Sequence, residues 1–158
     1  MDEIALRALM PQDAGAARAL VINQFGRTRY ESRVLEQLDA ALAFEDPEYM
    51  AMLALAPASD EVVGLMLFGT VAGARGVVKV HVVLGDDVAT RERLIAAVQN
   101  VAQDSGERMI VAEMAEDAPS LDAVEALRAC GFIEEGRIAD FVCDGVALRL
   151  LVWRPAAV

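Results

Sequence analysis

SLDAVEALRACGFIEEGRIADFVCDGVALRLLVWRP, residues 120–155, is the segment that says most about the fold. A helical pattern that starts at residue 119 or 120 reaches residue 129, and Gly131 ends it. Two strand-like runs follow, residues 132–142 and 146–154, on either side of Cys143-Asp144-Gly145. An Asp-Gly pair is typical of a tight turn between antiparallel strands. The segment therefore predicts a helix followed by a β-hairpin.

The preceding sequence predicts further strands and helices by its apolar spacing and its turn residues. Helices are expected from Pro11-Gln12-Asp13 to about Gly26, over residues 31–44 and over residues 90–104. Strands are expected over residues 4–8, 49–56, 61–71, 77–84 and 109–114. The order β-α-α-β-β-β-α-β-α-β-β predicts a single α/β (α+β) domain, residues 1–158. Its mixed, mostly antiparallel sheet should have about seven strands, with helices on both faces.

The chain is acidic, with a formal net charge of −11 over 158 residues. This charge argues against nucleic acid and against anionic membrane surfaces as partners. It is compatible with a cationic or amine substrate, or with solubility alone. No apolar run is long enough to span a membrane, and MDEIALRALM lacks the layout of a signal peptide. A cytoplasmic location is therefore expected.

Cys130 and Cys143 are the only cysteines, too few for a disulfide framework and wrongly spaced for a metal site. They are expected to be small buried residues, with catalysis by a Cys/His pair as the alternative. No metal cluster, Ser/His/Asp signature, P-loop or dinucleotide fingerprint is present in the sequence.

Residues 120–155 resemble the C-terminal part of the GNAT superfamily, the acyl-coenzyme A-dependent N-acyltransferases. The resemblance rests on Gly131-Phe132, Glu135-Gly136, Asp144-Gly145 and Trp153-Arg154, and the preceding order of elements extends it to nearly the whole chain. It implies transfer of an acyl group from acetyl-coenzyme A or another acyl-coenzyme A to a small-molecule or peptide amine acceptor. A homodimer is a further expectation.

The loop after the fourth strand departs from the family pattern. Relatives carry Arg or Gln, two free positions, Gly, one free position, then Gly or Ala. Residues 85–91 read GDDVATR, and no register supplies that pattern. Amides at a helix start still bind phosphate, whereas Asp86 and Asp87 oppose it by roughly 1 kcal/mol at an exposed loop. By this resemblance the expected cofactor-binding residues are Val82, Val83, Leu84, Gly85, Val88, Ala89, Thr90, Arg91 and Ser120.

Two further features of this region have open alternatives. Asp87 or Thr90 is expected to cap the helix. Arg91 and Arg93 lie in the first turn of this helix. One interpretation is that they contact a phosphate; the alternative is that they are surface arginines that pair with Glu92 or the aspartates.

The next helix departs from the family as well. Many relatives place a tyrosine four residues before the Gly-Phe glycine, as the acid that protonates the leaving thiolate, and an asparagine seven residues earlier. These positions hold Leu127 and Ser120. Leu127 cannot donate a proton.

His81 and Glu113 are the candidate general bases. His81 is the only histidine, and its ordinary pKa suits proton transfer near neutrality. Strand alternation puts Lys79, His81 and Val83 on one face, with Val78, Val80 and Val82 on the other. The resemblance implies that backbone amides of Val82, Val83 or Leu84 bind the thioester oxygen. Asp140 and Tyr30 are further candidate bases; a strand histidine that only packs is the structural alternative.

Two other functions remain open. One is a GNAT-fold protein that no longer catalyses and binds a ligand or partner, and the other is an unrelated antiparallel-sheet sensor domain. In the family, acceptor choice depends on the early helices and loops, here residues 23–49. Arg27, Arg29, Tyr30 and Arg33 form a basic segment there, suited to an anionic acceptor or cofactor group, or simply a solvated helix start.

Overall fold

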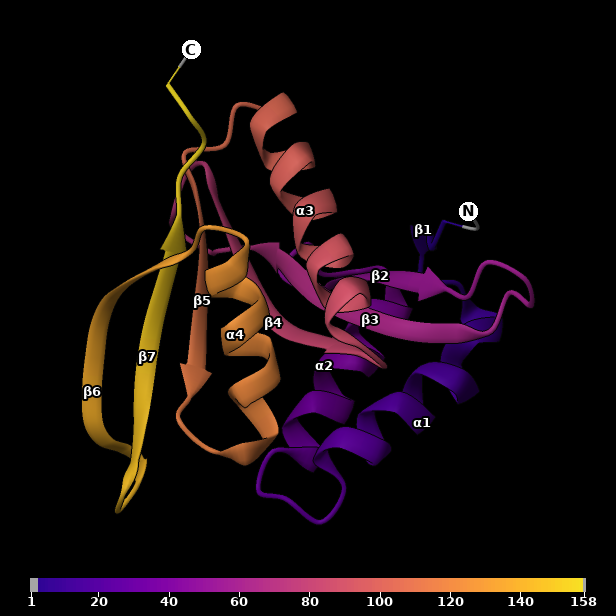
Figure 1. The fold of residues 1–158 in the computed structure, drawn as a ribbon, viewed down its shortest axis with the longest axis horizontal. Helices are drawn as coiled ribbons and strands as arrows, with labels where there is room; N and C mark the ends of the chain where they lie inside the picture. Colours follow the sequence, from indigo (N-terminus) through magenta and orange to yellow (C-terminus); the bar gives the residue numbers. More distant parts are fainter. Residues whose placement is uncertain (1–2, 158) are drawn as a thin grey trace.

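The computed structural model describes residues 3–157 and contains one seven-stranded sheet in the order β1-β2-β3-β4-β5-β7-β6 (Figure 1). Only β4 and β5 pair in parallel; the other neighbours are antiparallel. The strands are β1 (Ala5–Ala8), β2 (Met50–Leu55), β3 (Val62–Thr70), β4 (Val77–Gly85), β5 (Met109–Ala115), β6 (Ile133–Cys143) and β7 (Val146–Trp153).

The helices lie in the predicted order, which confirms the predicted fold class. They are α1 (Ala14–Phe25), α2 (Glu31–Ala43), α3 (Val88–Asp104) and α4 (Leu121–Ala129), with short 3-10 turns η1 (Pro11–Asp13) and η2 (Ala118–Ser120). The predicted start of α3 at Thr90 is wrong by two residues. Asp87, not Thr90, is the N-cap, because its carboxylate accepts a hydrogen bond from the Thr90 amide at 2.7 Å.

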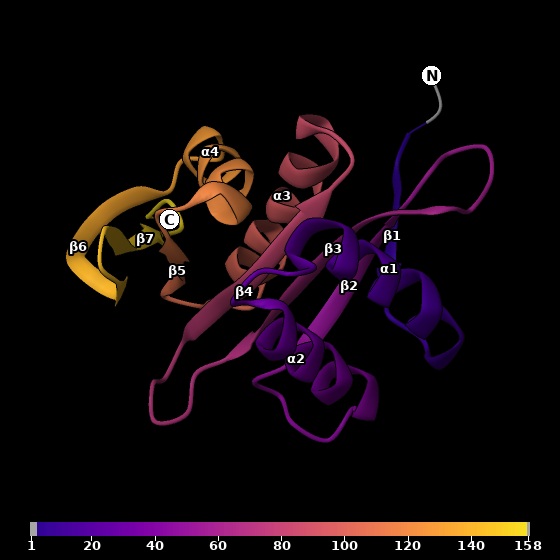
Figure 2. The same ribbon diagram turned by 90° about the horizontal axis from the view of Figure 1, so that it is seen from below.

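Helices cover both faces of the sheet, and each face has its own core (Figure 2). On one face α1 and α2 pack on leucines of β2 and β3, among them Leu53 and Leu67, both fully buried. On the other face α3 and α4 pack on Met66, Ile110 and Leu151. No helix within residues 3–157 is both long and apolar enough to span a membrane.

A β-bulge in β4 changes the faces predicted for its side chains. Leu67 of β3 pairs with Val82 but Phe68 pairs with Val80, so His81 is an extra residue opposite β3. Lys79 and His81 do share a face, as predicted. The predictions for the next two residues are wrong: Val82 belongs to the α1/α2 core and Val83 to the α3/α4 core. Strict alternation fails because the bulge adds one residue to the period of two.

The parallel strands β4 and β5 pair over only a short length. Their ladder runs from Val77–Met109 to Val80–Ala112. Beyond it β4 continues to Gly85 and β5 to Ala115 with no pairing between them. The sheet is therefore open between these two strand ends, directly after the bulge.

Candidate functional site

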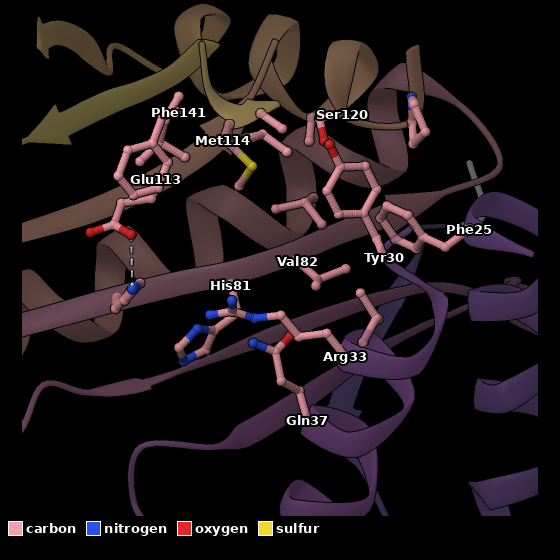
Figure 3. A pocket seen from close by; sticks show the side chains of 18 residues that line it. Phe25, Tyr30, Arg33, Gln37, His81, Val82, Glu113, Met114, Ser120 and Phe141 are labelled. Carbon is pink, nitrogen blue, oxygen red and sulfur yellow. Dashed lines mark hydrogen bonds and ion pairs between the residues drawn. The ribbon is translucent and has the colours of Figure 1, made fainter. Parts of the chain in front are cut away.

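A pocket of about 310 Å³ lies at this opening between β4 and β5 (Figure 3). Its walls come from α1, α2 and the loop between them, from β4 and β5, from η2 and α4, and from the β6–β7 hairpin. Val83 and Met114, which belong to the α3/α4 core, line it together with Val82 from the opposite core. The pocket therefore reaches from the α1/α2 face of the sheet into the gap between the strands.

His81 lines this pocket, and its orientation is held by two contacts. Its Nε2 lies 2.9 Å from the Glu48 carbonyl oxygen, and its ring stacks on Tyr49 with 5.0 Å between centroids. Because a carbonyl only accepts, Nε2 must carry the hydrogen, so the neutral ring has its lone pair on Nδ1. Burial lowers the pKa of His81, and the nearby charges of Lys79 and Arg33 lower it further. Neutral His81 thus offers a proton acceptor near neutral pH.

The Glu48 carbonyl can approach His81 because residue 69 is a glycine. A Cβ at Gly69 would lie 2.1 Å from the Glu48 oxygen and 2.5 Å from the Pro47 oxygen, both backbone atoms. The Thr70 amide donates to the Pro47 oxygen at 3.0 Å, which ties this segment to β3. The α2–β2 connection therefore packs against β3 at a distance that only glycine permits.

Glu113, the second predicted base, lines the same pocket from β5. Its carboxylate accepts a hydrogen bond from Lys79 Nζ at 3.3 Å, and half of its side chain is exposed. The structure thus brings His81 and Glu113, from neighbouring strands, to one pocket. Whether either is a base stays a prediction.

Two residues with hydroxyl groups, Ser120 and Tyr30, also line the pocket. Ser120 is buried, and among the described residues its hydroxyl forms no hydrogen bond. Tyr30 lines the pocket too, but its hydroxyl donates to Asp117. Burial raises the pKa of Tyr30, and the bond to Asp117 raises it further, so the Tyr30 proton is held away from the pocket. Leu127 is fully buried in the α3/α4 core and cannot contribute.

The loop between β4 and α3 lies at the end of β4, apart from the residues that line the pocket. Gly85 is explained by packing, because a Cβ there would lie 2.9 Å from the Cγ of Arg91. The Arg91 guanidinium donates back to the Gly85 carbonyl at 2.8 Å, and its Nε is buried without a partner within residues 3–157. Arg93 pairs with Glu3, not with Glu92 or the aspartates.

The first turn of α3 keeps two amides available to a ligand. The Thr90 side chain is buried and its amide is bonded to Asp87, whereas Val88 and Ala89 are exposed. The first amides of a helix have no intrahelical partner and attract anions. The Asp87 carboxylate lies at this first turn of α3 as well. The hydrogen bond from the Thr90 amide lowers the pKa of Asp87, so its carboxylate is ionised at neutral pH.

Other predicted positions have structural roles or lie elsewhere. Asp140 has a positive φ of 55°, and its carboxylate accepts from the Gly145 amide at 2.7 Å, which closes the hairpin. Both cysteines are free; Cys130 packs against the α3/α4 core, whereas Cys143 is half-buried beside the Arg29 guanidinium. No group of side chains suited to a metal ion occurs in the part of the chain that the structure describes.

The sequence predictions missed Gln37, which lines the pocket from α2 together with Arg33 of the predicted basic segment. They are four residues apart and so lie on one face of the helix. Gln37 follows the buried Val34 and precedes the buried Leu38, so it is a polar residue inside an apolar stripe. That interruption is the signal in the sequence that marks the position.

This sheet order, with helices on both faces and a pocket where β4 and β5 part, defines the GNAT acetyltransferase fold. A candidate acetyltransferase of the GNAT family from Desulfovibrio desulfuricans superposes with a TM-score of 0.80 at 20% identity, over 96% of this chain and 99% of that one. The aminoglycoside 6'-N-acetyltransferase from Enterococcus faecium superposes with a TM-score of 0.76 at 12% identity, over 98% and 99%.

A third structure with this fold contains a bound co-substrate. YncA from Salmonella typhimurium, with acetyl-coenzyme A, has a TM-score of 0.71 at 14% identity, over 96% of this chain and 93% of that one. No protein-family model matches the sequence, and no curated protein matches it. At these identities the likeness establishes the fold.

Proposed function

We propose that the protein is an N-acyltransferase that moves an acetyl or other acyl group from acyl-coenzyme A to an amine acceptor. The observation that carries the proposal is the pocket at the β4–β5 opening, which has His81 and Glu113 on its walls. It is supported by the GNAT fold and by neighbours described as acetyltransferases. A cytoplasmic location and a homodimer stay predictions from the sequence.

The residues after β4 fit a coenzyme A pyrophosphate through the start of α3. The amides of the exposed residues Val88 and Ala89 would hold it, with Arg91 close by. The carboxylates of Asp86 and Asp87 weaken this site, because like charges at an exposed loop repel by roughly 1 kcal/mol. We therefore expect binding that is weaker than a glycine-rich loop would provide.

The pocket residues divide the work of acyl transfer among them. Nδ1 of His81, or the Glu113 carboxylate, takes the proton from the attacking amine. The backbone N–H groups of a strand point alternately toward its two neighbouring strands. Beyond Val80, β4 pairs with β3 but not with β5, so the β4 amides that do not bond β3 face the opening. Those amides of residues 82–84 that face the opening would stabilise the negative charge that forms on the oxygen of the thioester carbonyl. Acyl-coenzyme A supplies the thioester carbonyl and a thiolate leaving group, and the Ser120 hydroxyl would donate a hydrogen bond to that thiolate.

A second candidate function is a binding module with the same fold and no catalysis. Two observations favour it: the Asp87 carboxylate occupies the start of α3, and the position of the usual tyrosine is the buried Leu127. The two candidates differ in whether acyl-coenzyme A binds.

Thermal unfolding with and without acetyl-coenzyme A separates them. At 100 times its dissociation constant, a ligand stabilises the folded state by about 2.7 kcal/mol. For a chain of this size that raises Tm by roughly 5–10 °C. We expect Asp87→Asn to bind about fivefold more tightly, because asparagine keeps the helix cap and removes about 1 kcal/mol of repulsion.

The matched control is Asp104→Asn, the same change at the opposite end of α3. It should leave the affinity for acetyl-coenzyme A unchanged. If neither the original protein nor Asp87→Asn gains stability at millimolar acetyl-coenzyme A, the acyltransferase proposal fails and the binding module remains. Equal affinities for Asp87→Asn and Asp104→Asn would contradict the role given to Asp87.

A further inference from the structure

The amide of a largely buried glutamine opens onto the pocket. Gln37 is only 8% exposed, yet within residues 3–157 its side chain forms no hydrogen bond. Figure 3 shows the amide directed from α2 toward the space beside His81. An amide that opens onto a cavity without a partner in the protein binds water there or the complementary atoms of a ligand.

Arg33 lies one helical turn before Gln37, and its guanidinium reaches the same space (Figure 3). No ion pair or hydrogen bond of the Arg33 side chain occurs among the described residues, although the chain has a net charge of −11. Arg7, Arg18 and Arg154 are each paired with a carboxylate. The exposed residues Arg27 and Arg75 also have unpaired side chains among the described residues, but unlike Arg33 they do not line the pocket. Arg33 therefore keeps its five donors free at the pocket.

The charges on the pocket wall leave Arg33 uncompensated. Lys79 is paired with Glu113, and His81 is held neutral by burial and by its cationic neighbours. A planar guanidinium can donate two parallel hydrogen bonds to the two oxygens of a carboxylate, and a neighbouring amide N–H can donate to one of the same oxygens.

We propose that Arg33 and Gln37 form a carboxylate-binding subsite, so that one of the two reactants carries a carboxylate. The proposal rests on the acyltransferase function and narrows its substrates. The favoured bearer is the acceptor, as in an amino acid. Its carboxylate would bind Arg33, and its amine would then lie in the same pocket as His81. The other source is an acyl group that ends in a carboxylate, as in succinyl-coenzyme A.

The size and lining of the pocket restrict the acceptor further. About 310 Å³ lies at the small end of the range for ligand pockets. Phe25, Val82 and Phe141 contribute apolar walls, which favour an apolar side chain. Neighbours with this fold include a spermidine/spermine N-acetyltransferase, whose named substrates are polycations. The uncompensated charge of Arg33 would repel such molecules here.

The test compares reactants that differ only in the carboxylate. A panel of apolar amino acids, each with its carboxamide, is assayed with acetyl-coenzyme A by release of the coenzyme A thiol. The carboxamides are then assayed with succinyl- against acetyl-coenzyme A. We expect kcat/KM to favour the carboxylate about tenfold or more in one arm, and Arg33→Gln to reduce that preference to near one through KM. The amine of an amino acid and the amine of its carboxamide differ in basicity. Comparing the acid-to-carboxamide preference in kcat/KM between the original protein and Arg33→Gln cancels this difference.

Arg27→Gln is the matched control, because Arg27 belongs to the same basic segment and does not line the pocket. It should keep the preference. If neither arm shows a carboxylate preference, or if Arg33→Gln keeps it, the subsite is overturned while the acyltransferase proposal stands.

A binding measurement separates failure of the subsite from failure of the function. His81 is the only histidine, so its imidazole NMR signals report ligand binding in the pocket without turnover. Titration with the amino acids of the panel should shift these signals in the original protein and in Arg27→Gln, but not in Arg33→Gln. This result without any turnover would leave the subsite standing in a binding module. Equal titrations in Arg33→Gln and the original protein would overturn it.

Discussion

Replacing His81 with alanine is expected to lower kcat/KM for acyl transfer at pH 7 by about 100-fold or more, the usual contribution of a general base. The reason is geometric as well as chemical. The Glu48 carbonyl fixes the hydrogen on Nε2 and leaves Nδ1 free, and burial lowers the pKa of the ring so that it is neutral at pH 7. Steady-state thiol release, with unfolding curves to confirm an intact fold, measures the effect.

The pH profile gives a second readout of the same role. Burial lowers the folded-state pKa of His81 from its ordinary value, so kcat/KM should hold at neutral pH and fall as the solution becomes acidic enough to protonate His81. Glu113→Ala should retain this acid limb, whereas His81→Ala should lose it. Rates within twofold of the original protein for both variants would remove both residues as bases.

Replacing Gly69 with alanine is expected to destabilise the fold by about 3 kcal/mol, the upper range for overpacking. The added Cβ would meet backbone atoms of Pro47 and Glu48 at 2.5 Å or less, and neither can rotate away as a side chain would. For this chain length Tm should fall by roughly 6–12 °C. The shift of Glu48 would also weaken its bond to His81, so the remaining folded protein should lose activity.

Gly15→Ala is the control for this substitution. A Cβ at Gly15, within α1, meets no atom within 4 Å, and alanine is the better helix former. Its Tm should stay the same or rise. An equal Tm for Gly69→Ala and the original protein would contradict the close approach between the α2–β2 connection and β3.

The fold was predictable because its signals are local. Asp144-Gly145 marks the last hairpin, Gly131 ends α4, and helical spacing marks α2 and α3. The bulge at His81 was not predictable, since VVKVHVVLG carries no local mark of it and only the pairing of Leu67 and Phe68 across the sheet defines it. The start of α3 depends on whether Asp87 or Thr90 caps the helix, and the sequence alone does not decide between them.

The candidate site was predictable only in part, for a related reason. His81 and Glu113 stand out as titratable residues in apolar strands, and the structure brings both to the pocket. Contacts such as Tyr30 with Asp117 join residues far apart in the chain, and no spacing rule anticipates them. The net charge of the chain, −11, also gives no indication that the basic residues Arg33 and Lys79 line the pocket.

The most direct test of the central claim is amine-dependent release of the coenzyme A thiol from acetyl-coenzyme A, with the acetylated amine identified by mass spectrometry. We predict release that requires both protein and amine, saturates with each reactant, and is strongest for a small apolar amine that bears a carboxylate. If no amine stimulates thiol release from protein saturated with acetyl-coenzyme A, the protein is not an N-acyltransferase.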